Sequence, residues 1–333
     1  MKQDIWVGVD IGGTKTAVVT SRKSPEIISR VEFPTLPKKG PQQTIDQILA
    51  AIHRMLAESS ASLRGIGISC GGPLDPNAGI IQSPANLPTW VDVPIVGILT
   101  NEFGCQVLLE NDANGGALAE HRYGAGRGTR NMVFLTMGTG LGAGIIIDKK
   151  LYAGSNGMAG EVGHVRLTKS GPVGCNKVGS VEGWASGGGM AQVAERMMKT
   201  ARKAGRKSLL LDLPRDRSVT AKDVNMAAAK GDSLARGIIH TCGKKLGLAL
   251  AILVDVLNPE RIVIGGLAMR MGETLLAPAR QAMRDEGLAP AVAICTVVPA
   301  ALGERIGDVA ALCIAMNAGA RERSRTEKGR EAV

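Results

Sequence analysis

The stretch IWVGVDIGGTKTAVVT, residues 5–20, decides the fold, because a glycine turn joins two runs of apolar and β-branched residues. Such runs favour strands, and IISRVEF at 27–33 reads as a third, so we expect an antiparallel meander over residues 5–33. The same sequence of strand, glycine turn and strand returns in TMGTGLGAGIII, residues 136–147. Its presence in both halves of the chain indicates a duplicated α/β unit.

Strands and helices alternate along the rest of the chain. A helix is expected to open at Pro41, where apolar residues follow helical spacing, and another to run from Asp112 to about Tyr123. Residues 199–218, rich in Lys, Arg and Gly, read as a loop or an insertion between helices. Further helices are expected at 187–203, 232–257, 270–285 and 303–322, and further strands at 65–69, 106–110, 131–137, 143–148, 261–266 and 293–298.

Composition bounds the class of protein. The chain has 333 residues, 44% of them hydrophobic, which is enough for two domains with buried cores. No signal peptide is expected, because the opening MKQDIWVGVDI has an acidic residue at position 4 and its apolar run is short. No membrane span is expected either, because no window approaches the roughly 18 uninterrupted apolar residues that a span requires. Six scattered cysteines without paired spacing indicate reduced thiols, and therefore a cytoplasmic location.

The formal charge of +10 makes a nucleic-acid partner a natural question. Basic residues gather at 196–217 and 321–330, but they lack interleaved aromatic residues and a recognisable binding module. A solvated helix face and a charged terminus account for them, so we expect neither a nucleic-acid nor a membrane partner.

Three glycine turns follow hydrophobic strands: DIGGTK (10–15), MGTGLGAG (137–144) and IGG (264–266). The bare N–H groups of such turns cradle phosphate, and Thr14 and Thr139 add hydroxyl groups. Asp10 adds a carboxylate, which suggests Mg²⁺ beside a nucleotide phosphate. The first turn fails as a P-loop because Lys15 comes one place late, and the second fails as a dinucleotide fingerprint because a strand follows it.

Polar residues that suit a hydroxylated substrate stand in three further segments. Within ENDAN (110–114), Asp112 lies between a strand and a helix, where it could cap the helix or act as a general base on an attacking hydroxyl. The glycine-rich loop GSNGMAGEVGHV (154–165) holds Glu161 and His164, and Glu182 follows in VGSVEGW. Carboxylates and an imidazole can accept from and donate to the hydroxyl groups of a sugar.

These segments together resemble the ROK family of repressors and sugar kinases over nearly the whole chain. DIGGTK is similar to its first phosphate motif, and GGPLDPNAGIIQSPANLPTWVDVPI (71–95) to its sugar-loop signature. ENDAN is similar to the segment with the catalytic aspartate, MGTGLGAG to the second phosphate motif, and GMAGEVGH to the sugar-binding Gly-x-Gly-His signature.

The resemblance implies an actin-like, hexokinase-like two-lobed ATPase fold of duplicated ribonuclease H-like domains, with ATP and sugar in the cleft between the lobes. The smaller lobe would span 1–115 plus 305–333, and the larger 116–304. Asp112 would be the base on a hexose hydroxyl, most simply that of C6, and Asp10 would hold Mg²⁺ through water. The implied sugar ligands are Asn86, Asn111, Glu161, His164 and Glu182, and the implied nucleotide ligands are Gly12, Gly13, Thr14, Lys15, Thr139, Gly140, Gly265 and Gly266.

One departure from the family concerns zinc. Many members bind zinc with a histidine and three cysteines in a C-x-C-G-x-x-G-C-x-E segment, but here VGCNKVGSVE (173–182) puts Val173 and Ser180 at two of the cysteine positions. His164 and Cys175 alone do not make a tetrahedral structural site, so no zinc is expected. The loop would then be held by packing and hydrogen bonds.

The resemblance leaves the substrate and the assembly open. Glucose is the first expectation, with N-acetylglucosamine, N-acetylmannosamine, fructose, mannose and allose as alternatives. Family repressors carry a DNA-binding segment before the first phosphate motif, whereas nine residues precede Asp10 here. A non-catalytic sugar sensor and a sugar-independent ATPase are the remaining alternatives, and the expected assembly is a homodimer or tetramer.

Overall fold

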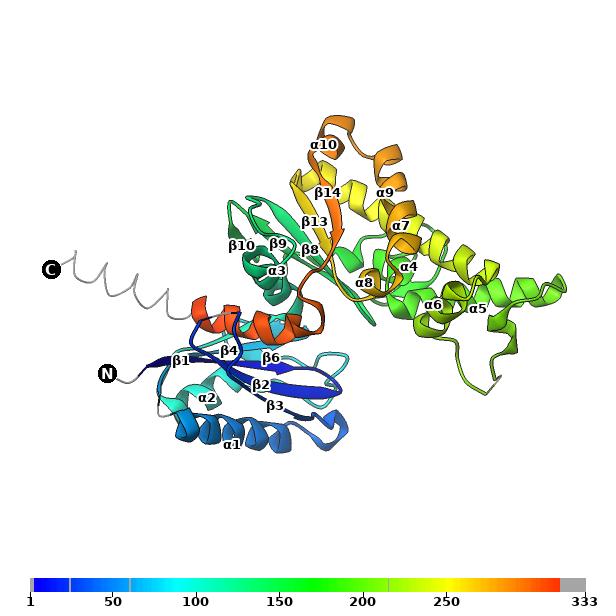
Figure 1. Ribbon diagram of the computed structural model, residues 1–333. Helices are drawn as coiled ribbons and strands as arrows, with labels where there is room; N and C mark the ends of the chain where they lie inside the picture. Colours follow the sequence, from blue (N-terminus) through cyan, green and yellow to red (C-terminus); the bar gives the residue numbers. More distant parts are fainter. Residues whose placement is uncertain (1–2, 24, 60, 215, 318–333) are drawn as a thin grey trace. The chain divides into compact units, whose positions relative to one another are not determined.

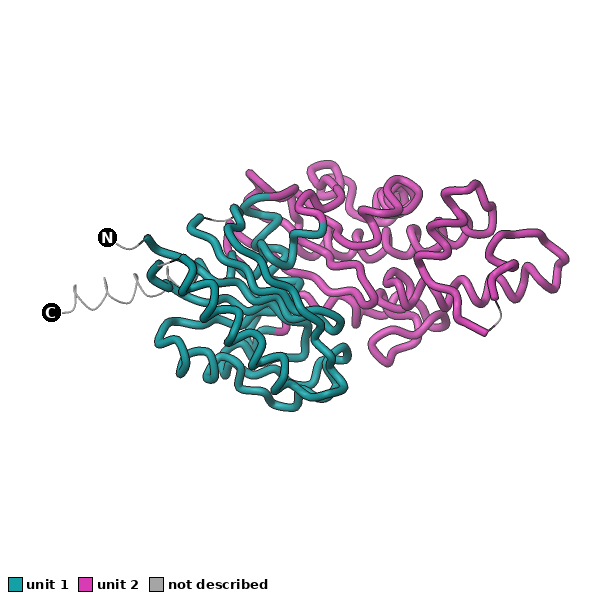
Figure 2. The backbone as a smooth tube through the Cα atoms, turned by 60° about the horizontal axis from the view of Figure 1, so that its bottom comes forward, with its two compact units in different colours: residues 1–123, 153–157, 304–333 teal, residues 124–152, 158–303 magenta. Residues whose placement is uncertain are grey.

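A computed structural model describes residues 3–23, 25–59, 61–214 and 216–317. The chain divides into two compact units (Figure 2). The first unit consists of Met1–Tyr123, Ala153–Gly157 and Glu304–Val333, and the second of Gly124–Tyr152 and Met158–Gly303. The first unit therefore extends to Tyr123 rather than to residue 115 as expected, because the helix that begins at Asp112 is buried within it almost throughout.

The first unit is built on a five-stranded sheet. Its strands are β1 (Asp4–Ile11), β2 (Lys15–Ser21), β3 (Ser29–Pro34), β4 (Ser62–Cys70) and β7 (Val107–Asn111), in the order β3-β2-β1-β4-β7. β1, β2 and β3 pair antiparallel, which confirms the predicted meander. β4 and β7 continue the sheet in parallel. The carboxyl ends of β1, β4 and β7 consequently share one edge of the sheet.

Helices cover both faces of this sheet (Figure 1). α1 (Gln42–Ser59) buries Ile45, Ile48 and Ile52 on one face, beside α2 (Ile95–Phe103). Residues 306–317 form a helix on the other face, as expected for the C-terminal segment up to the last described residue. This helix lies directly on β4, because a Cβ at Gly67 would be 2.2 Å from the carbonyl oxygen of Ala311. α3 (Asp112–Tyr123) follows β7, and the short strands β5 (Leu74–Asp75) and β6 (Ile80–Ile81) pair in the loop after β4.

The second unit repeats the sheet. β8 (Met132–Met137), β9 (Leu141–Ile147), β10 (Lys150–Tyr152), β13 (Arg261–Ile264) and β14 (Thr296–Pro299) stand in the order β10-β9-β8-β13-β14. As in the first unit, three strands pair antiparallel and two continue in parallel. The duplication predicted from the two glycine-turn hairpins is confirmed.

The helices of the second unit are α4 (Val181–Ala185), α5 (Gly187–Lys203), α6 (Ala221–Ala229), α7 (Ser233–Leu257), α8 (Leu267–Met271), α9 (Glu273–Glu286) and α10 (Ala289–Ile294). The helix expected at 270–285 is two helices, divided at Gly272 with φ 52°. The strand expected at 293–298 begins only at Thr296, because Pro290 in the first turn of α10 favours a helix there. The predicted loop at 199–218 begins after Lys203, since Met198 and Ala201 still bury their side chains.

α7 is the central helix of the second unit. It is long and apolar enough to cross a membrane by length and composition, although 61% of the most apolar window is buried inside the protein. Ile238, Leu246 and Leu250 are wholly buried in the core that α7 shares with α9 and α5. The apolar composition of α7 is therefore explained by its place in the core.

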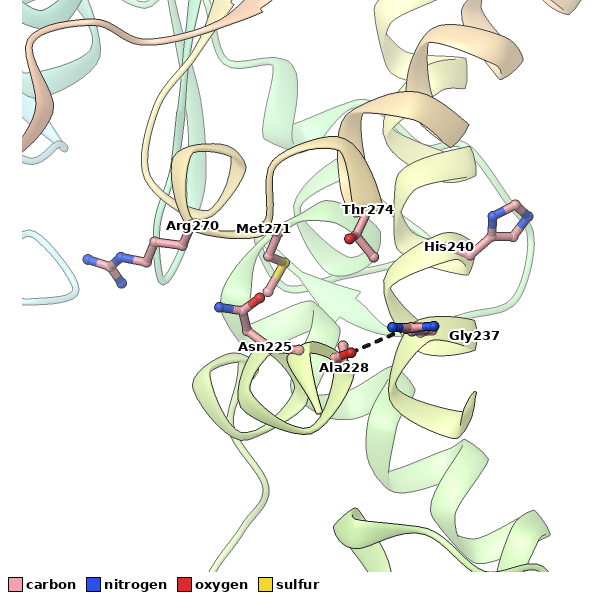
Figure 3. A pocket seen from close by; sticks show the side chains of 9 residues that line it. Asn225, Ala228, Gly237, His240, Arg270, Met271 and Thr274 are labelled. Carbon is pink, nitrogen blue, oxygen red and sulfur yellow. Dashed lines mark hydrogen bonds between the residues drawn. The ribbon is translucent and has the colours of Figure 1, made fainter. Parts of the chain in front are cut away.

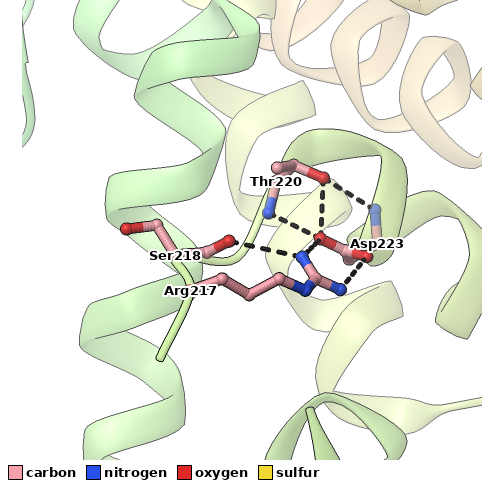
Figure 4. A network of polar contacts seen from close by, with 4 residues as sticks. All are labelled: Arg217, Ser218, Thr220 and Asp223. Atoms are coloured by element: carbon pink, nitrogen blue, oxygen red, sulfur yellow. Dashed lines mark hydrogen bonds and ion pairs between the residues drawn. The ribbon is translucent and has the colours of Figure 1, made fainter. Parts of the chain in front are cut away.

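Part of the basic segment 196–217 is used within the second unit. Arg217 donates to both carboxylate oxygens of Asp223, at 2.8 and 2.9 Å (Figure 4). Asp223 also accepts from the backbone and hydroxyl of Thr220, which completes a capping box at the start of α6. These partners hold the pKa of Asp223 well below its ordinary value, with the hydrogen bond from Arg217 the largest cause.

Candidate functional site

The first glycine turn joins β1 to β2 and is stabilised by the hydroxyl groups of threonine side chains. The N–H of Gly12 donates to the carbonyl of Lys15 at 3.0 Å, and the hydroxyl of Thr35 donates to the carbonyl of Gly12 at 2.7 Å. Thr16 contacts Thr35 through a second hydroxyl pair at 2.9 Å. Thr14 is exposed at the tip of the turn, in a position to face a ligand.

Asp10, the penultimate residue of β1, has an unusual electrostatic environment. Burial and the charges of Asp308 and Asp112 raise its pKa to about 7, against a hydrogen bond from Ser69 that lowers it. The helix at 306–317 begins directly against it, since a Cβ at Gly307 would lie 2.2 Å from Asp10 Oδ2. An excess of negative charge at a sheet edge is suited to a bound cation, and oxygen donors fit Mg²⁺.

Lys15 and Asp308 are connected by a chain of ion pairs across β2 and β3. Asp308 is 6% exposed and accepts from Arg30 Nε at 2.8 Å, and Arg30 also contacts Glu32 at 2.6 Å. Glu32 accepts from Lys15 Nζ at 2.8 Å. Lys15 thus lies at the end of the first glycine turn, with its ammonium group on Glu32.

Asn86 lies directly against the first glycine turn. A Cβ at Gly13 would be 2.7 Å from the Cβ of Asn86, so a side chain there would displace the loop that carries this residue. Leu87 and Trp90 fix the loop by burying their side chains completely. The predicted sugar ligand Asn86 is exposed, and the structure brings it to the predicted phosphate ligand Gly13.

The capping function considered for Asp112 belongs to its neighbour. Asn111, the last residue of β7, accepts a hydrogen bond from the N–H of Asn114 through Oδ1 at 2.8 Å. Glu110 in turn accepts from the N–H of Asn111 and from the side chain of Asn114. Asn111 therefore supplies the N-cap of α3 through Oδ1, and its Nδ2 is a hydrogen-bond donor. Asp112, in the first turn of α3, is exposed.

The second glycine turn joins β8 to β9 and rests on the start of α5. The N–H groups of Gly187 and Gly188 donate to the carbonyls of Gly138 and Thr139, at 2.8 and 3.3 Å. The glycine run 187–189 permits this approach, because a Cβ at Gly187 would lie 2.9 Å from the carbonyl oxygen of Gly138. The turn holding Thr139 and Gly140 is therefore fixed by the N-terminus of a helix.

The third glycine turn follows β13. Gly266 has φ 62°, and a Cβ there would be 2.1 Å from the carbonyl oxygen of Met137 at the end of β8. Gly265 donates its N–H to Leu135 at 2.8 Å. The predicted nucleotide ligands of the second and third turns are thus adjacent, at the carboxyl ends of neighbouring strands.

A cavity of about 590 Å³ opens beside the third turn, between α6, α7, α8 and α9. The side chains of Asn225, Met271 and Thr274 stand around it, while those of Arg270 and His240 extend to either side (Figure 3). Arg236 is fixed at its wall by a hydrogen bond from its Nε to the carbonyl of Ala228 at 3.2 Å. The glycine of the third turn, Gly266, is the N-cap of α8, which carries Arg270 and Met271 to this cavity.

Glu161 and His164 lie together in the loop after β10. His164 Nε2 is 3.8 Å from Glu161 Oε2, and both side chains are about half exposed. Lys177 Nζ donates to the carbonyl of His164 at 2.7 Å, which ties this short helical turn to the hairpin at 173–178. The pair presents one carboxylate and one imidazole to solvent from a fixed backbone.

Glu182, on α4, has both carboxylate oxygens engaged in hydrogen bonds within the protein. Its Oε1 accepts from the N–H of Cys175 at 2.7 Å, and its Oε2 accepts from the N–H of Leu141 at 3.1 Å. A Cβ at Gly140 would lie 2.8 Å from Oε2. Glu182 therefore joins the second glycine turn to the hairpin that contains Cys175.

Hydrogen bonds and packing hold the loop where related proteins are expected to place a zinc ion. Ser180 donates to the carbonyl of Gly174 at 2.9 Å and accepts from the N–H of Gly183, so that it caps α4. The backbone of Val173 makes two hydrogen bonds to the side chain of Gln192, both at 2.8 Å. Val173 and Ser180 do not fit zinc, and within the part of the chain that the structure describes no three His, Cys, Asp or Glu side chains form a metal-binding group.

Sequence reasoning missed several residues that shape these sites. The cap at Asn111, the hydroxyls of Ser69 and Thr35, the carboxylate of Asp308 and the glycine run after Ser186 were not singled out. The run GGG following a serine carried a usable signal, since Ser186 caps α5. The others act through partners distant in sequence, as in the contact between Arg30 and Asp308.

Known proteins are similar to this chain along almost its entire length. A sequence model described as the ROK family matches residues 6–318. The glucokinase of Halalkalibacterium halodurans is 37% identical over 284 residues, covering 84% of this chain and 85% of that protein. The glucokinase of Thermotoga maritima is 34% identical, covering 92% of this chain and 96% of that protein. A solved ROK family glucokinase from Streptomyces griseus, in complex with glucose and AMPPNP, aligns with a TM-score of 0.74 and 31% identity, covering 94% and 99% of the two chains.

Proposed function

This chain belongs to the ROK family and is an ATP-dependent sugar kinase, and we propose that its substrate is glucose, phosphorylated at the C6 hydroxyl. The observation that supports Asp112 as the base is that Asn111 caps α3. The helix therefore does not need the Asp112 carboxylate as its cap. The relatives named glucokinase support glucose over the other hexoses.

Asp112 acts in this proposal as the general base. As the C6 oxygen attacks the γ-phosphorus, its proton passes to the Asp112 carboxylate, and the bond from that phosphorus to the β,γ-bridging oxygen breaks to release ADP. A carboxylate at the exposed start of a helix can reach a substrate hydroxyl directly. Asn86 and Asn111, also in the first unit, would orient the sugar with their amide groups.

Asp10 is the proposed holder of Mg²⁺, through water. When bound, the ion would supply positive charge that offsets the charge of the phosphate groups. Burial first, and then the charges of Asp308 and Asp112, raise the pKa of Asp10 to about 7, and a cation would balance those charges. Gly12, Gly13 and Thr14 would donate to phosphate from the same turn, and Lys15 would add a positive charge there.

The second unit contributes the remaining binding groups. Thr139 and Gly140 would face phosphate, and Gly265 and Gly266 would approach the nucleotide. The cavity beside α8 suits the nucleoside end, because it combines apolar Met271 and Ala228 with the amide of Asn225. Glu161 and His164 would accept from and donate to sugar hydroxyls, with Glu182 behind them.

A cytoplasmic location and a homodimer or tetramer complete the proposal. All six cysteines are free thiols, the state expected in a reducing compartment. The assembly stays a prediction, which light scattering of the purified protein decides.

The function is tested by ATP-dependent ADP release across glucose, mannose, fructose, allose, N-acetylglucosamine and N-acetylmannosamine. We expect the highest kcat/KM with glucose, and a phosphorus NMR spectrum of the product that shows the ester at C6. A higher value with another sugar would replace glucose by one of the alternatives. If no sugar stimulates ADP release, the kinase assignment fails, and a sugar sensor and a sugar-independent ATPase are the remaining alternatives.

A further inference from the structure

Thr35, the residue directly after β3, lies at the centre of a cluster of hydrogen bonds on the first glycine turn. It is 1% exposed. Its N–H donates to the carbonyl of Thr14 at 3.1 Å, and its hydroxyl donates to the carbonyl of Gly12 at 2.7 Å. Its own carbonyl accepts from the hydroxyl of Thr44, on α1, at 2.7 Å. One residue therefore binds the turn at two carbonyls and is itself anchored to a helix.

The direction of the hydroxyl bonds follows from the single proton that each hydroxyl carries. The carbonyl oxygen of Gly12 has no proton to give, so the hydroxyl of Thr35 is the donor in their bond. The contact of 2.9 Å between Thr35 Oγ1 and Thr16 Oγ1 is then a bond that Thr16 donates. Loss of the Thr35 hydroxyl would deprive two buried polar groups of a partner, the carbonyl of Gly12 and the hydroxyl of Thr16.

The backbone just after Thr35 is in an uncommon conformation. Leu36 has φ 49° and ψ 55°, in the left-handed region that a bulky residue adopts rarely. The following residues, Pro37–Lys39, form a short helical turn, and the carbonyl of Pro37 accepts a hydrogen bond from the hydroxyl of Thr89. Such a conformation persists where the surroundings enforce it, and here the residues on both sides of Leu36 are hydrogen bonded. The position of Thr35 is therefore strongly determined.

The bond to Gly12 also sets the direction of the next N–H. The peptide group between Gly12 and Gly13 is planar and trans, so its carbonyl and its N–H point in opposite directions. Because the carbonyl points to the buried Thr35, the N–H of Gly13 points away from it. Gly13 itself has no room for a side chain, since a Cβ would lie 2.7 Å from the Cβ of Asn86. A bare N–H presented by a glycine turn is a donor for an anion such as phosphate.

We infer that Thr35 is a positioning residue for the first glycine turn, and that its hydroxyl orients the Gly12–Gly13 peptide so that the N–H of Gly13 meets a nucleotide phosphate. This role rests on the proposed function, because it requires phosphate to bind at this turn. The hydrogen bond from Thr35 to Gly12 does not depend on that proposal.

The inference is tested with two ligands that differ in their phosphate groups. Binding of AMPPNP with Mg²⁺, and of adenosine, is measured by isothermal titration calorimetry in the wild type, Thr35→Val and Thr35→Ser. Thr35→Val keeps the shape of the side chain and loses the hydroxyl. We expect it to bind AMPPNP about tenfold more weakly, in the range of one lost hydrogen bond to a charged group, and adenosine within about twofold of the wild type. Thr35→Ser keeps the hydroxyl and should restore the AMPPNP affinity to within about threefold.

Thr20→Val is the matched control for the loss of a buried threonine hydroxyl. Thr20 is also 1% exposed and lies on β2, but it pairs with Ser29 at the end of the β2–β3 ladder opposite the glycine turn. Its AMPPNP affinity should equal that of the wild type. Thermal unfolding of each variant separates a loss of folding from a loss of binding.

Three results would overturn the inference: a Val variant at position 35 with wild-type AMPPNP affinity, a Val variant that loses AMPPNP and adenosine affinity equally, or a Ser variant as weak as the Val variant. A wild-type protein that binds AMPPNP no more tightly than adenosine would refute phosphate binding, and with it the proposed function. Amide hydrogen exchange at Gly12, whose N–H donates to Lys15, would then still decide whether Thr35 holds the turn. This exchange should be at least about tenfold faster in Thr35→Val and unchanged in Thr35→Ser.

Discussion

The two glycine-turn hairpins share one backbone pattern and differ in the charges around them. In the first unit, the penultimate residue of β1 is Asp10, and two more carboxylates lie near it. In the second unit, the penultimate residue of β8 is Thr136, and the turn is fixed by the N-terminus of α5 and by Glu182. The duplicated fold thus provides a glycine turn twice, and we propose that the surrounding side chains fit the first for proton transfer and cation binding and the second for holding substrate.

The largest effect on stability and kcat is expected when the charge at Asp10 is removed. The first turn would then have an uncharged side chain at the penultimate strand position, as the second turn has at Thr136. The pKa of Asp10 is raised from 3.8 to about 7, so the native state binds more protons than the unfolded chain between these values. Stability therefore falls as pH rises through this window and remains reduced above it, by at most about 4 kcal/mol.

Asp10→Asn should accordingly unfold at a higher temperature than the wild type at pH 8 and at nearly the same temperature at pH 4. Its kcat should fall about a hundredfold, and more added Mg²⁺ should be needed. Thermal unfolding at the two pH values is the measurement. Equal shifts at both would show that the Asp10 charge is not the cause.

The next largest effect is expected at the third glycine turn, where Gly266 lies against the backbone of Met137 just before the second turn. Gly266→Ala places a Cβ 2.1 Å from the carbonyl oxygen of Met137 and requires φ 62° of an alanine. We expect a loss of about 3 kcal/mol in stability and a large loss of ATP affinity. Gly205→Ala is the matched control, because Gly205 has φ 63° but nothing within 4 Å of its Cβ. Equal melting temperatures for the two variants would contradict the close approach.

A smaller effect is expected at His164, where the second unit should act on binding alone. His164→Gln keeps a polar side chain but loses the imidazole near Glu161. The sugar KM should rise about tenfold, the cost of one good hydrogen bond to a charged partner, with kcat changed less than about threefold. His53→Gln, an exposed histidine on α1, is the control and should leave both constants unchanged. A fall in kcat without a rise in KM would give the second unit a part in the chemistry.

The smallest effect lies away from both turns, in the capping box of α6. Asp223→Asn should reduce stability by about 1 kcal/mol, a typical cost for a lost cap contact, and leave kcat and KM unchanged. The folded-state pKa of Asp223 is lowered, so its contribution is present above the ordinary value of 3.8 and is lost as the pH falls. Melting temperatures of the two proteins should differ at pH 7 and converge toward pH 2. A constant difference would show that the charge of Asp223 is not involved.

The sequence predicted the parts of the fold that depend on neighbours in the chain. Apolar alternation and glycine placed β1, β2, β8 and β9, and the duplicated order of both sheets followed. It did not separate Asn111 from Asp112 as the cap of α3, because either residue type can cap and only the last pairing of β7 decides which one stands at the boundary. Nor could it show that both oxygens of Glu182 are engaged, since Leu141 lies 41 residues away. Local patterns predict elements, whereas these contacts arise when distant segments pack.

The most direct test of catalysis by the first unit and binding by the second is the kcat of Asp112→Asn with glucose and saturating ATP. Removal of a general base is expected to lower kcat by about 10²- to 10⁴-fold, while the sugar KM stays within about threefold of the wild type. The melting temperature should be unchanged, because Asn111 and not Asp112 caps α3. A variant that is folded and retains the wild-type kcat would contradict the assignment of catalysis to the first unit.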